Sequence, residues 1–236
     1  MLVAAFAYAS VGHGGASAYI AALALAGVAP AEMRPIALLL NILVSAIGTY
    51  KFRRAGYFRW RLFWPFAAVS VPLAFVGGAV TLPGHAYRIL VGVVLVYAAW
   101  QLWRSARAGE EMREVREPPV GRAMGIGASL GFLSGLTGVG GGIFLSPVLL
   151  MLGWAGTKQT SAVAAPFILV NSIAGLAGGF TMSAASLPAY IWLLALAVLV
   201  GGWFGAEYGS RRFANPLVRR ILAIVLAAAG AKMVLV

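Results

Sequence analysis

Long runs of apolar residues, separated by short polar segments, make up most of the chain. A helix needs about 20 predominantly apolar residues to cross the hydrocarbon core of a bilayer. The blocks that approach or exceed this length cover roughly residues 2–28, 35–51, 62–82, 87–104, 123–153, 160–180, 188–206 and 217–236. These eight hydrophobic blocks predict an all-α, polytopic membrane protein.

The first and fifth blocks differ from the others, because each is longer than one crossing requires and has a glycine cluster in its middle. Glycine costs about 1 kcal/mol in a helix interior, so the run Gly140–Gly142 argues against a continuous helix. We expect both blocks to fold as Gly-broken helical hairpins. Irregular backbone at membrane depth is tolerated only against protein or a wet cavity. The glycine turns should therefore line a cavity near the bilayer centre.

Composition supports the same class of protein. Hydrophobic residues make up 61% of the chain and charged residues 10%, and the mean hydropathy is +0.91. Because a soluble domain has about a quarter charged residues, this composition excludes a soluble enzyme, a disordered chain and a nucleic-acid-binding module. The net charge of +12 is better explained by basic cytoplasmic loops, since Lys and Arg set the orientation of membrane proteins.

The charges of the loops predict which side each loop occupies. Residues 51–61, 104–122 and 207–220 are rich in Lys and Arg, so we place them in the cytoplasm. Residues 181–188 have no charge, and residues 81–88 have Arg88 alone. We place these two loops outside the cell.

The chain contains an internal duplication, because three short motifs recur in the same order. The matched segments are Gly12–Gly15 with Val139–Gly142, Asn41 with Asn171, and Arg88–Leu90 with Arg220–Leu222. The loop after the second block is strongly basic and its counterpart after the sixth is uncharged, whereas the third and seventh blocks show the reverse bias. A charge bias that swaps sides between copies is typical of two inverted-topology repeats. The predicted organisation is a first transmembrane repeat at 1–104, a charged cytoplasmic linker at 105–122 and a second transmembrane repeat at 123–236.

The glycine turns and the polar residues matched with them are the candidate substrate-binding positions. Helix N-termini and successive backbone N–H groups bind anions, although glycines also allow close helix packing. A buried amide in lipid must be paired, so each asparagine either holds a glycine hairpin in place or donates to a substrate oxygen. The candidate set is Gly14, Gly15, Ser17, Asn41, Thr137, Gly140, Gly141, Gly142 and Asn171.

Several kinds of chemistry lack the residues that they need. The chain has no Cys and no Asp, which excludes disulfides, thiolate metal sites and a thiol relay. Two His are a poor supply for a transition-metal site, so we expect no metal, no cofactor and no catalytic residues. His13, inside the first glycine turn, is the candidate for proton coupling. A membrane-embedded hydrolase would have to pair His13 with Ser10 or Ser17.

In its motifs the sequence resembles the sulfite exporter TauE/SafE family, also called the toluene sulfonate uptake permease family. Gly135–Pro147 has the small-residue stretch, the Gly-Gly-Gly turn and the apolar run with proline of that family, and Lys158–Ala162 fits its polar helix start. Arg53–Gly56 and Trp60–Arg61 match its basic loop. The first glycine turn departs from the family pattern, because it contains His13 and no proline follows it.

The resemblance implies transport of a small, mostly sulfur-containing anion, such as sulfite or an organosulfonate, across the inner membrane. We therefore expect a multi-pass secondary transporter that works by alternating access. Its expected partners are the small anionic substrate and the lipid bilayer, with a homodimer as a further candidate and no nucleic acid. The lack of carboxylates in the membrane blocks agrees with an anion rather than a cation. An anion channel and a non-transporting membrane subunit or assembly factor stay open as alternatives.

Overall fold

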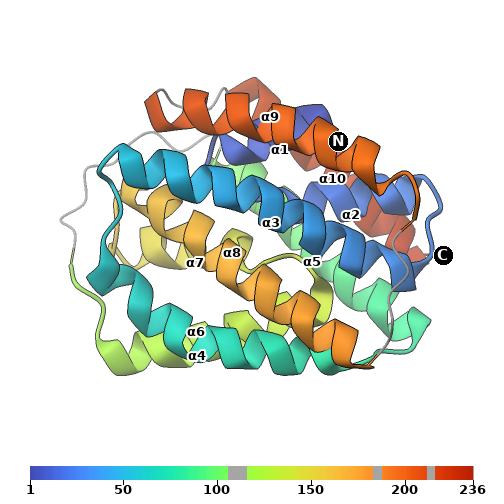
Figure 1. Ribbon diagram of the computed structural model, residues 1–236, viewed down its shortest axis with the longest axis horizontal. Coiled ribbons are helices and arrows are strands. Elements are labelled where there is room, and N and C mark those ends of the chain that lie inside the picture. Colours follow the sequence, from blue (N-terminus) through green and yellow to red (C-terminus); the bar gives the residue numbers. More distant parts are fainter. Residues whose placement is uncertain (106–115, 183–187, 212–215, 236) are drawn as a thin grey trace.

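The computed structural model describes residues 1–105, 116–182, 188–211 and 216–235, and within these residues the regular structure is helical throughout (Figure 1). The helices are α1 (Leu2–Ala9), α2 (Ala16–Leu25), α3 (Pro30–Arg54), α4 (Trp60–Ala79), α5 (Gly84–Ser105), α6 (Val120–Thr137), α7 (Gly142–Met151), α8 (Thr157–Met182), α9 (Ile191–Arg211) and α10 (Pro216–Leu235). The predicted all-α class is confirmed. Most of the predicted linker, residues 106–115, lies outside the described residues.

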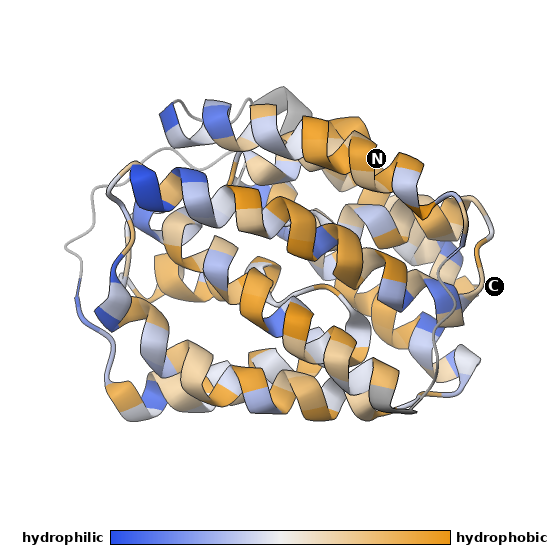
Figure 2. Cartoon of the chain, viewed as in Figure 1, coloured by the Kyte–Doolittle hydropathy of each residue, from blue (hydrophilic) through white to orange (hydrophobic). Residues whose placement is uncertain are grey.

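Several of these helices have the dimensions of membrane spans. By length and hydropathy, five described helices can cross a membrane, namely α3, α4, α5, α8 and α9. The shorter apolar helices are α2, α7 and the Leu222–Leu235 part of α10. Figure 2 shows apolar residues along the helices and polar residues gathered toward their ends. The chain is thus a polytopic α-helical membrane protein.

The two long blocks break at their glycine clusters, whereas every other block forms one long helix. The first block gives α1 and α2, separated by residues 10–15, and the fifth gives α6 and α7, separated by residues 138–141. The first arms differ in length, since α6 has 18 residues and α1 has 8. Glycines with positive φ at these breaks adopt backbone conformations that other residues avoid.

Helices α3 and α8 form an antiparallel pair through the middle of the molecule (Figure 1). Gly48 of α3 lies against Ala165 of α8, and Arg34 lies against Gly179 at the opposite end of the pair. Asn41 lies about halfway between these contacts and bonds to Ser172. The pair therefore places the first matched asparagine at the centre of the bundle.

Two further helix pairs flank this centre, α4 with α6 and α1 with α9. In each pair, glycines four residues apart pack directly on the backbone of the partner helix. The contacts are Gly127, Gly131 and Gly135 of α6 with Phe66, Ser70 and Ala74 of α4, and Gly201, Gly205 and Gly209 of α9 with Leu2 and Phe6 of α1 and with Ser10, which directly follows α1. Small residues let membrane helices approach closely enough for such backbone contact.

The helix contacts of the first half have counterparts in the second. If α1–α5 are matched in order with α6–α10, the pairing of α1 with α9 corresponds to that of α6 with α4, and α2 with α3 corresponds to α7 with α8. This arrangement agrees with a duplicated unit. The inverted orientation of the two halves in the membrane stays a prediction, as do the boundaries of the repeats.

Candidate substrate site

The first glycine turn, residues 10–15, joins α1 to α2 and is held by hydrogen bonds within the hairpin. The backbone N–H of His13 donates to the carbonyl oxygen of Tyr8 at 2.9 Å. The hydroxyl of Tyr19 donates to the carbonyl oxygen of Gly14, also at 2.9 Å. Gly15 has φ +98° and directly precedes α2. These contacts aim the N-terminus of α2 at the middle of the bundle.

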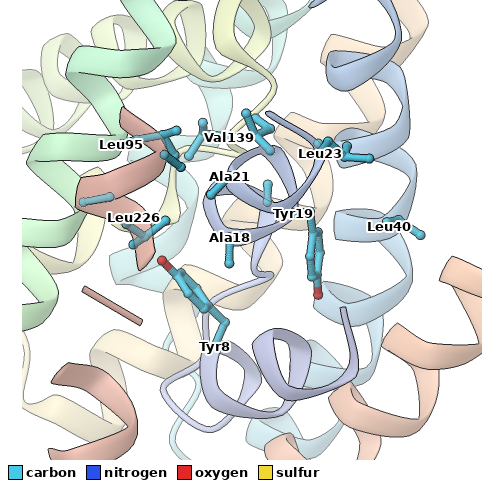
Figure 3. Packing of buried hydrophobic residues seen from close by; sticks show 14 of the residues in the cluster. Tyr8, Ala18, Tyr19, Ala21, Leu23, Leu40, Leu95, Val139 and Leu226 are labelled. Carbon is cyan, nitrogen blue, oxygen red and sulfur yellow. The ribbon is translucent and has the colours of Figure 1, made fainter. Parts of the chain in front are cut away.

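The two tyrosines of the first hairpin belong to the buried core, and Figure 3 shows Tyr8 and Tyr19 with Ala18 between them. The hydroxyl of Ser17 donates to the Tyr8 oxygen at 2.9 Å. Ser17, a predicted substrate-binding residue, therefore links the two arms of the hairpin in this structure.

The second glycine turn, residues 138–141, joins α6 to α7. Gly138, Gly140 and Gly141 have φ of +81°, +81° and +77°. The hydroxyl of Thr137 donates to the carbonyl oxygen of Leu133 at 2.6 Å and accepts a long bond from the N–H of Val139. Thr137 therefore closes the last turn of α6 in this structure, and its predicted contact with a substrate stays a prediction.

The two glycine turns meet at Asn41. A Cβ on Gly14 would overlap Oδ1 of Asn41, and a Cβ on Gly140 would overlap its Nδ2. Ile168 of α8 lies against Gly14, Gly140 and Gly142, so it closes the other side of the same contact. Asn41 is 0% exposed. The structure thus brings residues of both predicted turns together around one of the two predicted asparagines.

The turns reach Asn41 from opposite ends of the central helix pair. Gly12 of the first turn lies against Ser161, near the N-terminus of α8, and the Ser161 hydroxyl donates to the carbonyl oxygen of Val11 at 2.9 Å. Gly138 of the second turn lies against Arg34, near the N-terminus of α3. Because α3 and α8 are antiparallel, these two contacts lie at opposite ends of the bundle.

The side chain of Asn41 has one bonded end and one unbonded end. Its Nδ2 donates to Oγ of Ser172 at 3.0 Å, while Oδ1, next to Gly14, has no hydrogen-bond partner among the described residues. A hydroxyl both donates and accepts, so Ser172 satisfies either orientation of this amide. In the rotated orientation Ser172 donates to Oδ1, and the unbonded end beside Gly14 is an N–H₂ donor.

Asn171 differs from its predicted counterpart. Its Nδ2 donates to the carbonyl oxygen of Phe167 in its own helix at 2.8 Å. A carbonyl only accepts, so this bond fixes the amide and leaves Oδ1 as a buried acceptor without a partner in the described part of the chain. Gly141 contacts Phe167 and Ser134 rather than Asn171. The structure therefore gives the two asparagines different surroundings.

Other buried polar atoms surround the second hairpin. Ser134 Oγ, Ser146 Oγ and Thr160 Oγ1 also lack a hydrogen-bond partner among the residues described. Unpaired buried polar groups are costly, and their concentration on α6, α7 and α8 suits a site that binds water or a polar ligand.

His13 and the acidic residues Glu32 and Glu207 make the following contacts in the described part of the chain. His13 is half-buried, and its Nδ1 lies 3.0 Å from the carbonyl oxygen of Val11. Glu32 lies in the first turn of α3, and Glu207 on α9 forms an ion pair with Lys51. Within the described residues, no group of three His, Cys, Asp or Glu is placed to hold a metal ion. The polar groups at Asn41 are thus amide, hydroxyl and backbone groups.

Arg34 is a polar residue that the sequence reasoning missed. It lines a pocket of about 480 Å³ together with Glu32 and Tyr87, among other residues of α3, α5, α8 and the α4–α5 loop. In the sequence, Arg34 stands at the boundary of an apolar block. Composition alone explains an arginine there as a residue that sets the orientation of the chain in the membrane. Only the fold shows that this arginine touches the second glycine turn.

Comparison with known proteins adds the family. The family described as Sulfite exporter TauE/SafE matches residues 1–233. The chain is 43% identical over 235 residues to the "Probable membrane transporter protein y4hK" of Sinorhizobium fredii (strain NBRC 101917 / NGR234), covering 98% of this chain and 94% of that protein. No solved structure matches the chain significantly.

Two more distant relatives have similar names. The "Probable membrane transporter protein YunE" of Bacillus subtilis (strain 168) is 30% identical over 130 residues, which cover 54% of this chain and 45% of that protein. The "Probable membrane transporter protein ORF9" of Sinorhizobium sp is 24% identical over 205 residues, covering 86% of this chain and 76% of that protein. These names indicate membrane transport rather than enzymatic catalysis.

Proposed function

Because this chain belongs to the sulfite exporter TauE/SafE family and is a membrane transporter, we propose that it carries a small oxyanion across the inner membrane by alternating access. Sulfite and organosulfonates are the substrates that we favour. The observation that carries the proposal is the meeting of two glycine turns, from opposite ends of the central helix pair, at the buried Asn41.

The chemistry of the meeting point suits an anion. The first N–H groups of a helix have no partner within that helix, and α2 and α7 both begin at the glycine turns. The positive ends of these helix dipoles favour negative charge. Asn41 and Ser172 add an amide and a hydroxyl, and neither glycine turn carries a carboxylate. Discontinuous helices whose N-termini face an anionic group are a recurring device of secondary transporters.

The buried state of the site supports alternating access. Asn41 and Ser172 are both 0% exposed, so the bundle must open before an anion can reach them. The turns contact Asn41 through glycines, without a side chain between them. Moving the first hairpin would open the site toward the Ser161 end of the bundle, and moving the second would open it toward the Arg34 end. The two hairpins are therefore natural candidates for the two gates.

Flux into proteoliposomes tests the proposal. We would measure uptake of radiolabelled sulfite, sulfate and methanesulfonate by the wild type, Asn41→Asp and Gly140→Ala. Asn41→Asp keeps the shape of the side chain but places a carboxylate beside Gly14. Gly140→Ala puts a methyl group against Asn41, and Gly56→Ala is its matched control, because Gly56 also has positive φ (+80°) but no neighbour within 4 Å.

We expect saturable uptake of at least one anion, counterflow, at least about tenfold lower kcat/KM in both site variants and little change in Gly56→Ala. If Gly56→Ala lowers kcat/KM to the same degree, the effect of Gly140→Ala would come from backbone strain and not from its contact with Asn41. Uptake that neither saturates nor shows counterflow would favour an anion channel. If the folded wild type moves none of these anions, the oxyanion assignment is wrong, and a non-transporting subunit becomes the better interpretation.

A further inference from the structure

The pocket at the N-terminal end of α3 has one cation in its lining, the guanidinium of Arg34, among residues that are mostly apolar or small. Leu38 and Tyr87 form parts of its wall, and Gly175 and Gly179 of α8 form another part. The volume of about 480 Å³ is ample for a small oxyanion with several waters. This pocket lies at the end of the bundle that the loop charges place outside the cell.

Arg34 is held in place by the end of α4. Its Nη1 donates to the carbonyl oxygen of Val80 at 3.0 Å, and its Nη2 donates to that of Gly78. These two bonds use two of the five N–H donors of a guanidinium. Fixing the group in this way lowers the entropy that is lost when a ligand binds to its other donors. Planar arginine donors match oxyanions, often through two parallel hydrogen bonds.

The same residue connects the pocket to the glycine site. Its side-chain stem packs against Gly138, the first residue of the second glycine turn. Tyr87, across the pocket, donates from its hydroxyl to the carbonyl oxygen of Thr137 at 3.1 Å, at the end of α6. Two residues of the pocket lining, Arg34 and Tyr87, therefore contact the α6 end of the turn whose Gly140 touches Asn41.

We propose that this pocket is an anion-binding vestibule in which Arg34 supplies the charged donor for a small oxyanion before it reaches Asn41. The inference rests on the proposed function, since it names the residue that collects the substrate of that site. Glu32 is the carboxylate in the pocket lining and would oppose the anion. It is solvent-exposed at the rim, where water and salt screen its charge, whereas Arg34 is half-buried next to the turn.

Because the chain has no cysteine, a single introduced thiol can report binding in this pocket. Thr81 is exposed and lines the pocket. We would reconstitute Thr81→Cys in proteoliposomes, label it with a membrane-impermeant maleimide, and measure how sulfate or methanesulfonate slows labelling at constant ionic strength. Neither anion reacts with maleimides. We would repeat the measurement in three double variants, in which Thr81→Cys is combined with Arg34→Gln, Arg34→Lys or Arg88→Gln.

Arg88→Gln is the matched control, because it removes the same charge from the same end of the molecule but Arg88 does not line the pocket. We expect protection in the parent and in Arg88→Gln, and a half-protecting concentration raised at least about tenfold in Arg34→Gln, the loss expected for a charged hydrogen bond. Arg34→Lys should retain part of the protection. Glu32→Gln, at an exposed position where folding is not at risk, should lower the half-protecting concentration.

Two results would overturn the vestibule, namely no protection in the parent, or equal protection in Arg34→Gln and the parent. If Arg34→Gln does not fold, an unchanged half-protecting concentration in Glu32→Gln would count against it in the same way. Failure of the vestibule is distinguishable from failure of transport. Saturable flux that is lost in Asn41→Asp but insensitive to Arg34 would leave the transport site standing. If protection depends on Arg34 but the protein shows no flux, the proposal of an anion-binding pocket would stand and the proposal of a carrier would be wrong.

Discussion

At the residue scale, one hydrogen bond distinguishes the two matched asparagines. Asn41 bonds across helices to Ser172, whereas Asn171 bonds to the carbonyl of Phe167 in its own helix. Their similar places in the sequence predicted similar roles, and the different neighbours of each amide show why matched positions need not be equivalent. Asn41 is the better candidate for substrate contact, because both glycine turns touch it.

The bond between Asn41 and Ser172 should be measurable as an interaction energy. Hydrogen bonds between membrane helices contribute about 0.6 kcal/mol on average and up to about 1.7 kcal/mol. We expect the variant that combines Asn41→Ala and Ser172→Ala to lose less stability in detergent than the sum of the two single losses. The difference should fall in this range. The free energy of unfolding of all four proteins in the cycle tests this expectation. Strict additivity would mean that the two side chains do not interact.

At the element scale, the glycine stripes set how closely the helices approach. Gly131 of α6 packs on the backbone of Ser70 in α4, so no side-chain rotation can relieve an added methyl group. The two glycine clusters were predictable from the sequence as helix breaks. Which glycines face another helix depends on the rotation of each helix about its axis. The sequence does not determine that rotation when apolar residues surround a helix on all sides.

Two substitutions on α6 separate packing from helix propensity. Gly131→Ala should destabilise the protein by about 1–3 kcal/mol, because it overpacks a backbone contact. Gly125→Ala, on the same helix with no neighbour within 4 Å, should be neutral or stabilise by up to about 1 kcal/mol, since alanine is the better helix former. Thermal unfolding in detergent, followed by tryptophan fluorescence, would compare the two. Equal melting temperatures would show that α4 and α6 are not packed as described.

At the scale of the whole molecule, the corresponding helix contacts of the two halves agree with duplication. Their opposite orientation is still a prediction, derived from the swapped loop charges. It matters for the proposed function, because inverted halves place one glycine hairpin on each side of the membrane. A carrier that alternates access requires such a pair of gates.

Cysteine labelling in intact cells tests the inversion. Ala55 follows α3, Ala189 lies between α8 and α9 in the sequence, and both residues are exposed. Since α3 and α8 are the matched helices, we expect an impermeant maleimide to label Ala189→Cys in intact cells and Ala55→Cys only after permeabilisation. The cysteine-free chain provides the background control. Labelling of both from the same side would contradict inverted repeats.

The sequence by itself determined the class of protein, the approximate positions of the helices and the two breaks. These features depend on local composition, because apolar length decides what crosses a bilayer and glycine clusters decide where a helix ends. The family resemblance, carried by the order of motifs around Gly135–Pro147, was also available from the sequence and is confirmed.

Only the tertiary structure decided which polar residues meet. It placed Asn41 between Gly14 and Gly140, engaged Ser17 and Thr137 in hairpin contacts, and brought Arg34 to the second turn. Each of these contacts depends on which helices pack together and on how each helix is rotated about its axis. A nearly uniform apolar pattern contains little information about the packing or the rotation. The breaks in the helices were therefore predictable, whereas the site that they form depends on how the two hairpins pack around α3 and α8.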